Sequence, residues 1–261
     1  MFVSSQNGAR PLRQDLDREN VNKDFGNRAA RAEHALPGTH ELVVNTALRH
    51  SPSGGRALDL GAGTGDLAER LQGAGFRVTA ADAENYFELG SEFVTLDFNE
   101  YDFHRRFSPP FDLITAVEVI EHLENPFAFL RGICHLLSDE GVAIVTTPNV
   151  ENVPGRLKFF LTGKVRPMES NTPGHIMPIH LDLFQRVIAP RAGLAILEHT
   201  TYPKGEFPLT ARRYFHPLFR LLTPLLRGPA LTGDSHIFVL KRQSRQVNRG
   251  GTVPEVGRSL G

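Results

Sequence analysis

Apolar residues in this chain alternate between two patterns from residue 56 onward: short continuous runs, and runs with helical spacing. The short runs are rich in Val, Ile, Leu and Ala, which predicts buried strands. These predicted strands cover residues 57–60, 77–81, 92–96, 112–117, 141–147, 195–201 and 236–241. Because helical segments separate most of them, the pattern predicts an α/β fold with a doubly wound parallel sheet. The ligand of such a sheet binds at the carboxyl ends of the strands.

Helix signals fall between these strands. One helix is expected from about Asp66. A second begins at Asn125 and Pro126, since Asn is a good capping residue and Pro suits the first helical turn. Its apolar spacing stops between Ser138 and Gly141. A third helix is predicted over residues 181–192.

Composition narrows the protein class. The 261 residues are enough for one sizeable α/β domain with extensions. Lys and Arg together number 29 and so do Asp and Glu, which argues against a nucleic-acid partner. Cys134 is the single cysteine, so no intramolecular disulfide forms. Neither a secretory leader nor a membrane-spanning run is evident, and a cytoplasmic protein is expected.

A glycine-rich turn follows the first predicted strand. Gly61, Gly63 and Gly65 alternate there, which lets the backbone turn sharply and a flat ligand approach closely. A dinucleotide site requires G-x-G-x-x-G, but here the third glycine comes one residue early. Asp66 follows it and Asp59 precedes the turn. An acidic turn suits a ligand that carries an ammonium and a sulfonium better than one with a pyrophosphate.

The segment Asp-Leu-Gly-Ala-Gly-Thr-Gly at 59–65 resembles the first motif of class I S-adenosylmethionine (SAM) dependent methyltransferases. The segment FDLITAVEVIEHLENP at 111–126 resembles the fourth motif of the same family, and the resemblance covers residues 56–149. It implies a Rossmann-like, seven-stranded, mostly parallel sheet with an antiparallel last strand. It also implies N-terminal helices, a helical insertion before the last strand, and SAM as cofactor.

Acidic residues at the strand ends support this interpretation. A nucleotide ribose needs a carboxylate at the end of the second strand, and Asp82 lies there, 21 residues after Gly61. In the resembled family the end of the third strand contacts adenine, which implicates Asp97 and Phe98. The predicted cofactor-binding residues are Asp59, Gly61, Ala62, Gly63, Gly65, Asp82, Ala83, Asp97, Phe98, Val117 and Glu118.

An acid-acid-histidine segment follows the fourth strand. One helical turn would bring Glu118, Glu121 and His122 onto one face. Similar E-x-x-E-H segments occur in ubiquinone-pathway O-methyltransferases and in small-RNA 2′-O-methyltransferases, where they contribute to metal sites. His175 and His180 lie 53 and 58 residues further on. The resemblance therefore implies a Mg²⁺ or Mn²⁺ site at Glu118, Glu121, His122 and His180. The alternatives are a metal-free pocket role and a purely structural role.

Methyl transfer from SAM needs no covalent enzyme intermediate, because a sulfonium is already a strong electrophile. Placing the acceptor in line with the methyl group supplies much of the rate enhancement. An oxygen acceptor must also lose a proton, and His122 and His180 are the predicted catalytic bases. The leading interpretation is thus a methyltransferase acting on a small or lipid-like acceptor at oxygen. A small-RNA 2′-O-methyltransferase and a SAM-binding, non-catalytic scaffold are the alternatives.

Domain boundaries follow from these assignments. Residues 1–27 and 243–261 are expected to be disordered or loosely attached tails around a single domain at 28–242. Helices over 28–50 are expected to cover the cofactor, and insertions at 150–180 and 202–232 to bind the acceptor or form a lid. The segment 211–227 mixes apolar residues with four arginines, and Pro217 and Pro224 interrupt its helical pattern. This segment is predicted to form a lid, a dimer contact or a peripheral membrane contact.

Overall fold

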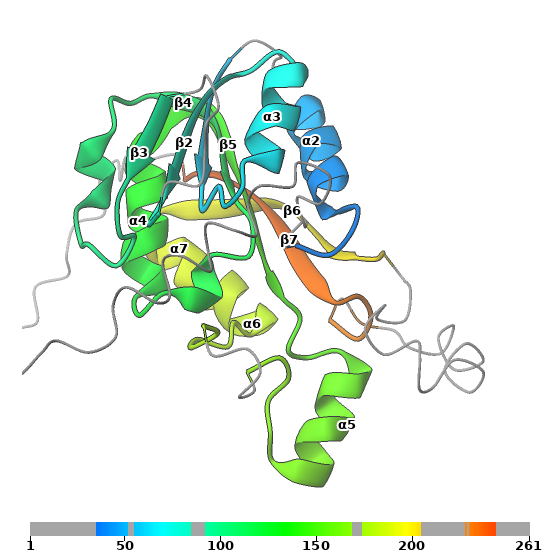
Figure 1. Ribbon diagram of the computed structural model, residues 1–261. Coiled ribbons are helices and arrows are strands. Elements are labelled where there is room, and N and C mark those ends of the chain that lie inside the picture. Colours follow the sequence, from blue (N-terminus) through cyan, green and yellow to red (C-terminus); the bar gives the residue numbers. More distant parts are fainter. Residues whose placement is uncertain are drawn as a thin grey trace, which may run out of the picture. The chain divides into compact units, whose positions relative to one another are not determined.

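A seven-stranded sheet is the centre of the described part of the chain (Figure 1). The computed structural model describes residues 35–51, 55–84, 92–168, 174–204, 228 and 230–243. The chain divides into two units, Met1–His34 and Ala35–Gly261, and every described residue belongs to the second. The predicted N-terminal tail, the predicted C-terminal tail beyond residue 243 and the segment 211–227 lie outside the described residues.

The strand order is β3-β2-β1-β4-β5-β7-β6. Strands β1 to β5 pair in parallel, whereas β7 is antiparallel to both of its neighbours, β5 and β6. This confirms the predicted seven-stranded, mostly parallel sheet with an antiparallel last strand. The strands are β1 (Arg56–Leu60), β2 (Arg77–Asp82), β3 (Glu92–Thr95), β4 (Phe111–Ala116), β5 (Leu137–Pro148), β6 (Leu194–Tyr202) and β7 (Ser235–Arg242).

The fifth strand is longer than predicted. It begins directly after a helix that ends at Leu136, rather than at Gly141. Leu137 pairs with Phe111, and the pairing register then shifts before Val142 meets Leu113. The polar residues 138–140, which resemble a turn in the sequence, thus lie in the strand next to an irregularity in the pairing.

The helices have local sequence causes. Asn125 caps the helix after β4 as predicted, because its side chain accepts a hydrogen bond from the Ala128 N–H at 3.0 Å. The helix predicted over 181–192 contains a π-helical turn, next to Pro190, which has no N–H for an α-helical bond. The helical segments are α2 (Thr39–His50), α3 (Asp66–Gly73), η1 (Phe103–Arg106), η2 (Ile120–His122), α4 (Pro126–Leu136), α5 (Val153–Thr162), α6 (Leu181–Leu183), η3 (Phe184–Ile188) and α7 (Ala189–Arg191).

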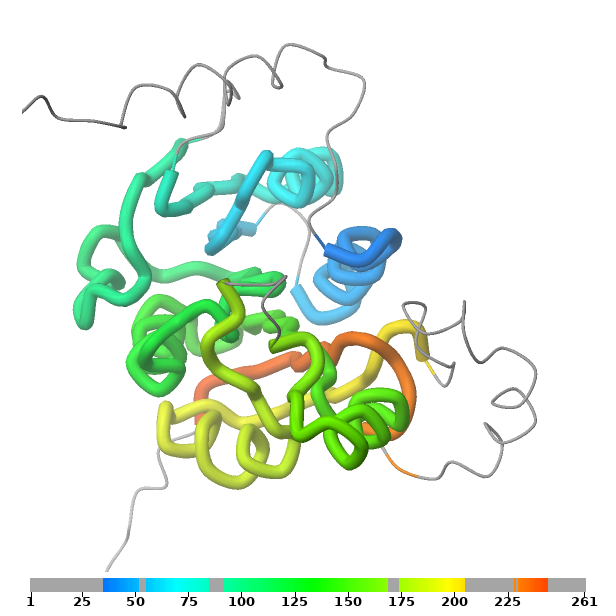
Figure 2. The backbone as a smooth tube through the Cα atoms, turned by 60° about the horizontal axis from the view of Figure 1, so that its bottom comes forward, coloured from blue at the N-terminus to red at the C-terminus, as the bar shows by residue number. Residues whose placement is uncertain are grey.

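The helices cover both faces of the sheet, as two views of the chain show (Figures 1 and 2). On one face, α2 and α3 bury an apolar cluster that includes Val43, Leu71 and Ile144. On the other face, α4 and the α6–α7 run bury a second cluster around Phe129 and Phe184. Both faces of the sheet are therefore covered mainly by apolar side chains.

Helix α5 differs from the others. It lies beyond the carboxyl end of β5 (Figure 1), and Gly155 is its one buried residue. The Asn152 side chain caps it by accepting from the Gly155 N–H, and Gly163 ends it with φ +68°. Within the described ranges, the structure contains no helix with the length and hydropathy required to span a bilayer.

Candidate functional site

The glycine turn joins β1 to α3 at the carboxyl edge of the sheet. Gly61, Gly63 and Gly65 all have positive φ angles, the region that side chains other than glycine rarely adopt. At Gly61 an added Cβ would lie 2.3 Å from Cγ2 of Val119. Only glycine fits there, because the segment after β4 packs directly against the turn.

Asp82 ties the second strand to this turn. Its carboxylate accepts hydrogen bonds from the N–H groups of Gly63 and Ala83, each at 2.7 Å. The two segments that were predicted separately as cofactor-binding are thus neighbours. At the end of the third strand, the Asp97 carboxylate accepts from the Asn99 N–H at 2.8 Å, and the Phe98 ring packs edge-on against Phe103.

Asp59 lies beneath the turn and is 1% exposed. One carboxylate oxygen accepts from the Thr115 hydroxyl at 2.7 Å, while the other has no hydrogen-bond partner. Burial raises the pKa of Asp59 to about 7, although the Thr115 bond lowers it and the nearby Asp82 charge raises it further. Asp59 can therefore either bind a cation with its free carboxylate oxygen or hold a proton there.

Glu118 is held in an unusual backbone conformation. Its φ is +54°, which is rare for a residue with a side chain. Thr146 holds it there: the Glu118 N–H donates to the Thr146 hydroxyl at 3.0 Å, and that hydroxyl donates to the Glu118 carboxylate at 2.8 Å. Burial raises its pKa to about 7. Strain of this kind concentrates at functional sites.

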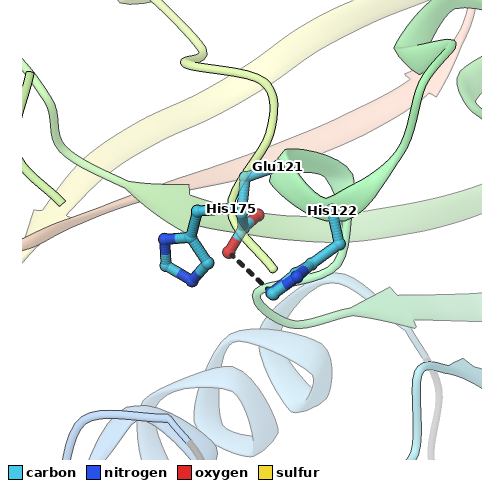
Figure 3. A group of neighbouring side chains, drawn as sticks. All are labelled: Glu121, His122 and His175. Atoms are coloured by element: carbon cyan, nitrogen blue, oxygen red, sulfur yellow. Dashed lines mark ion pairs between the residues drawn. The ribbon is translucent and has the colours of Figure 1, made fainter. Parts of the chain in front are cut away.

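Glu121 lies between two imidazoles (Figure 3). Its side chain is fully buried, and neither carboxylate oxygen makes a hydrogen bond of good geometry within the described ranges, although its own N–H and the Thr147 hydroxyl are close enough to lower its pKa. Nε2 of His122 is 4.0 Å from the carboxylate, and the rings of His122 and His175 meet edge-to-face at 4.7 Å. Burial and then the charge of Glu118 raise the pKa of Glu121 well above its ordinary value.

His175 enters this group through the backbone. The Glu121 carbonyl accepts from the N–H groups of Ile176 and Met177, both at 2.9 Å, which fixes the segment that carries His175. Gly174 sits so close to His122 that a Cβ there would lie 2.9 Å from Nδ1. Glu121, His122 and His175 each offer one potential ligand atom, and these three atoms lie within 4.8 Å of one another. A carboxylate with two imidazoles is a donor set for a divalent transition metal.

His180 lies elsewhere. Its side chain is 52% exposed, and Nδ1 is 3.7 Å from the Glu151 carboxylate rather than in the group of Glu121, His122 and His175. Glu151 also accepts from the Leu181 N–H at 2.7 Å and so caps α6. Glu151 was not predicted, because an acid that caps a helix 30 residues away leaves no local signal in the sequence.

The predicted residues thus fall into two adjoining groups. The turn, Asp59 and Asp82 form the first, and Glu121, His122 and His175 form the second. Val119 packs against Gly61, so the segment between Val117 and His122 connects them. Glu118 belongs to this connection through Thr146 and is not part of the group of potential metal ligands.

Comparisons with known proteins agree with this geometry. The model of a family described as "Methyltransferase domain" matches residues 31–199. A ubiquinone biosynthesis O-methyltransferase from Caulobacter sp. (strain K31) is 35% identical over 107 residues. That alignment covers 36% of this chain and 41% of the relative, so the chain spans less than half the length of this curated relative.

Solved structures share the fold at low identity. A SAM-dependent methyltransferase from Archaeoglobus fulgidus has a TM-score of 0.51 at 16% identity, with 78% of this chain and 95% of that chain covered. The plantazolicin methyltransferase BamL, solved with a desmethylPZN analog and SAH, has a TM-score of 0.52 at 13% identity, with 88% and 92% covered. At these identities the likeness concerns the fold alone.

Proposed function

This chain belongs to the methyltransferase-domain family, and we propose that it is a SAM-dependent methyltransferase that methylates an oxygen atom of a small or lipid-like acceptor. The observation that carries this proposal is the buried Glu121 carboxylate, whose oxygens are unpartnered beside His122 and His175. The name of the Caulobacter relative, an O-methyltransferase, supports the same choice of atom.

In this proposal the glycine turn and its acids hold SAM. Asp82, fixed by two backbone N–H groups, accepts from the ribose hydroxyls, as a carboxylate at this strand end does in nucleotide-binding folds. The free oxygen of Asp59 favours the cationic end of the cofactor, because a nearby positive charge restores the ionised form of a buried acid. Asp97 and Phe98, at the end of β3, remain the proposed adenine contacts.

The reaction releases one proton. A C–O bond forms between the acceptor oxygen and the methyl carbon, the C–S bond breaks with its electron pair on sulfur, and the acceptor O–H proton must leave. We assign this proton to His122, which is 41% exposed and can reach an acceptor. The adjacent Glu121 carboxylate would stabilise the imidazolium that results, since a buried charge gains most from a close opposite charge. His180 is the second proposed base, at the Glu151 side.

A divalent metal is compatible with the same residues. Glu121, His122 and His175 would hold it, because their donor set and its unpartnered oxygens suit such an ion. A bound ion would supply Lewis acidity that lowers the pKa of an acceptor hydroxyl. Both routes place the removal of the proton beside Glu121 and His122.

A methyl-transfer screen tests the proposal. Phenols, quinol precursors, sugars and short RNA would be offered with SAM, with and without a chelator, and methylated products identified by mass spectrometry. We expect an O-methylated small molecule. Glu121→Gln should lower kcat about 100-fold, in the range of acid–base catalysis, while leaving SAM affinity unchanged.

The controls separate the parts of the proposal. Full activity after metal removal would reject an essential ion at the Glu121 group. Methylation only at nitrogen or carbon would overturn the choice of oxygen. Methylation of short RNA alone would favour the 2′-O-methyltransferase alternative, which the zero net charge of the chain opposes.

A further inference from the structure

A short segment before β7, residues 230–234, is held through its backbone carbonyls. Each of the five carbonyls accepts a hydrogen bond from residues 149–153, which follow β5. Most of these bonds come from Asn149. They run from the Asn149 amide to Ala230 (2.9 Å), Thr232 (3.0 Å) and Gly233 (3.2 Å), from the Asn149 N–H to Asp234 (2.6 Å), from the Asn152 amide to Gly233 (3.0 Å) and from the Val153 N–H to Leu231 (3.2 Å).

The two asparagines of this network are buried, and each uses both ends of its amide. Asn149 and Asn152 are both 3% exposed. The Asn149 side-chain oxygen accepts from the Glu151 N–H at 3.0 Å, and the Asn152 oxygen caps α5 by accepting from the Gly155 N–H at 2.9 Å. Breaking a bond in such a network leaves a buried polar group without a partner, which costs more than the bond itself contributes. Residues 230–234 are therefore fixed against the end of β5.

The network begins where the ladder between β5 and β7 ends. Pro148, the last residue of β5, pairs with Ser235, the first residue of β7. Proline has no N–H to donate to a neighbouring strand. The N–H and the amide of Asn149 supply the hydrogen bonds beyond this point. Asn149 therefore helps to set where β7 begins.

Ser235 lies on the same face of the sheet as Thr146, which binds Glu118. Thr146 pairs with Ile237, and Ser235 precedes Ile237 by two residues, so the side chains of Thr146 and Ser235 are diagonal neighbours. The electrostatics agree with this placement. Burial raises the pKa of Glu118 most, the hydroxyls of Thr146 and Ser235 lower it, and the charge of Asp234 raises it further. The start of β7 is therefore next to Glu118.

We propose that Asn149 is a positioning residue for the cofactor, which holds Asp234 and Ser235 beside Glu118 at the methionine end of bound SAM. Two neighbouring acids, Glu118 and Asp234, favour the ammonium group that this end of the cofactor carries. Arg166 lies 3.9 Å from Asp234 and offsets part of the negative charge. The inference rests on the proposed function and on the predicted role of Glu118 in binding the cofactor.

Replacing Asn149 with Asp tests this role, because it removes the amide donor and keeps the oxygen that accepts from Glu151. Asn149→Asp turns an oxygen toward the carbonyls of residues 230–233 and should weaken SAM binding about tenfold or more in calorimetry. Methylthioadenosine lacks the ammonium and the carboxylate of SAM. Its affinity should change less than about twofold, since its proposed contacts lie at the Asp82 turn. A merely structural role would weaken both ligands alike.

A matched pair of capping residues keeps the test decisive if Asn149→Asp does not fold. Asn152 and Asn125 each cap a helix with the side-chain oxygen, and Asp caps about as well as Asn. Asn152→Asp also loses the bond to Gly233 and should weaken SAM binding about threefold. Asn125→Asp should leave SAM binding unchanged. Circular dichroism would show that each variant is folded.

Several results would overturn the proposal. These are unchanged SAM affinity in the folded variants at positions 149 and 152, equal losses for SAM and methylthioadenosine, or an equal loss in Asn125→Asp. A higher KM for the acceptor with unchanged SAM affinity would assign the network to acceptor binding instead. Wild-type protein that binds no SAM would reject the proposed function itself. Wild-type protein that binds SAM as tightly as the variants do would reject only the role of Asn149.

Discussion

Replacing Asp59 with Asn should reveal how much the buried carboxyl costs the protein before a ligand is bound. The Asp59 side chain has one bonded oxygen and one without a partner, and burial raises its pKa from 3.8 to about 7. In the unfolded chain the carboxyl loses its proton near the lower value. Between those two pH values the folded protein therefore binds more protons than the unfolded one, and its stability falls as pH rises.

The size of the effect follows from the same shift. Across the full window the ionisation of Asp59 lowers the free energy of unfolding by about 4 kcal/mol. Most of that loss, about 3 kcal/mol, falls between pH 5 and pH 8. Asn keeps the size and the acceptor for Thr115 but never ionises. Its amide N–H₂ lacks a partner, which adds a constant cost of about 1–3 kcal/mol at both pH values.

Urea unfolding of both proteins without SAM, at pH 5 and at pH 8, measures this difference. The stability of Asp59→Asn relative to wild type should improve by about 3 kcal/mol between the two pH values. Asp97→Asn, the same change at an exposed strand end, serves as the control for a lost charge. A gap between wild type and Asp59→Asn that stays constant from pH 5 to pH 8 would refute the reasoning, because it would mean that Asp59 ionises normally in the folded protein.

Three further substitutions test the architecture of the site. Asp82→Ala removes the acceptor for the Gly63 and Ala83 N–H groups and should weaken SAM binding about tenfold or more by calorimetry; unchanged affinity would contradict its assignment. Gly61→Ala should destabilise the fold by about 3 kcal/mol in thermal or urea unfolding, since φ is +77° and the new Cβ meets Val119; a neutral effect would show that the turn relaxes easily. Thr146→Ala removes the two hydrogen bonds between Thr146 and Glu118 and should lower kcat/KM about tenfold, with Thr146→Ser restoring it. Failure of Ser to restore activity would assign the loss to packing.

The sequence was informative wherever the cause of structure is local. The glycine turn, the strand end at Asp82 and the cap at Asn125 depend on residues within a few positions, and these features of the fold agree with prediction. Strand β3 ends at Thr95, two residues before the predicted end at Asp97. The early start of β5 at Leu137 was missed because pairing with Phe111 overrides the turn-like residues that follow it. The bounds of a strand depend on the neighbouring strands with which it pairs, and the sequence of one strand does not show which strands those are.

The identity of the second imidazole illustrates the same limit. His175 and His180 are both at suitable distances along the chain, and the spacing alone cannot choose between them. Two hydrogen bonds to the Glu121 carbonyl bring His175 to the group, while the Glu151 carboxylate holds the start of α6 and lies beside His180. The groups that hold His175 belong to the backbone, which every residue carries, and Glu151 lies 30 residues before Leu181. No local motif therefore records either placement.

Raised pKa values distinguish three of the candidate acids from the others. The chain has as many acidic as basic residues, and its net charge gives no sign of a cationic ligand. Yet Asp59 and Glu121 are buried and Glu118 is half-buried near one edge of the sheet, and loss of water is the main cause that raises the pKa of each. Three such carboxyls destabilise an empty protein at neutral pH, and a bound cation relieves that cost. We propose that the sulfonium and ammonium of SAM supply such charge at Asp59 and Glu118, the two of these acids that are assigned to the cofactor, whereas Glu121 belongs to the group with His122 and His175.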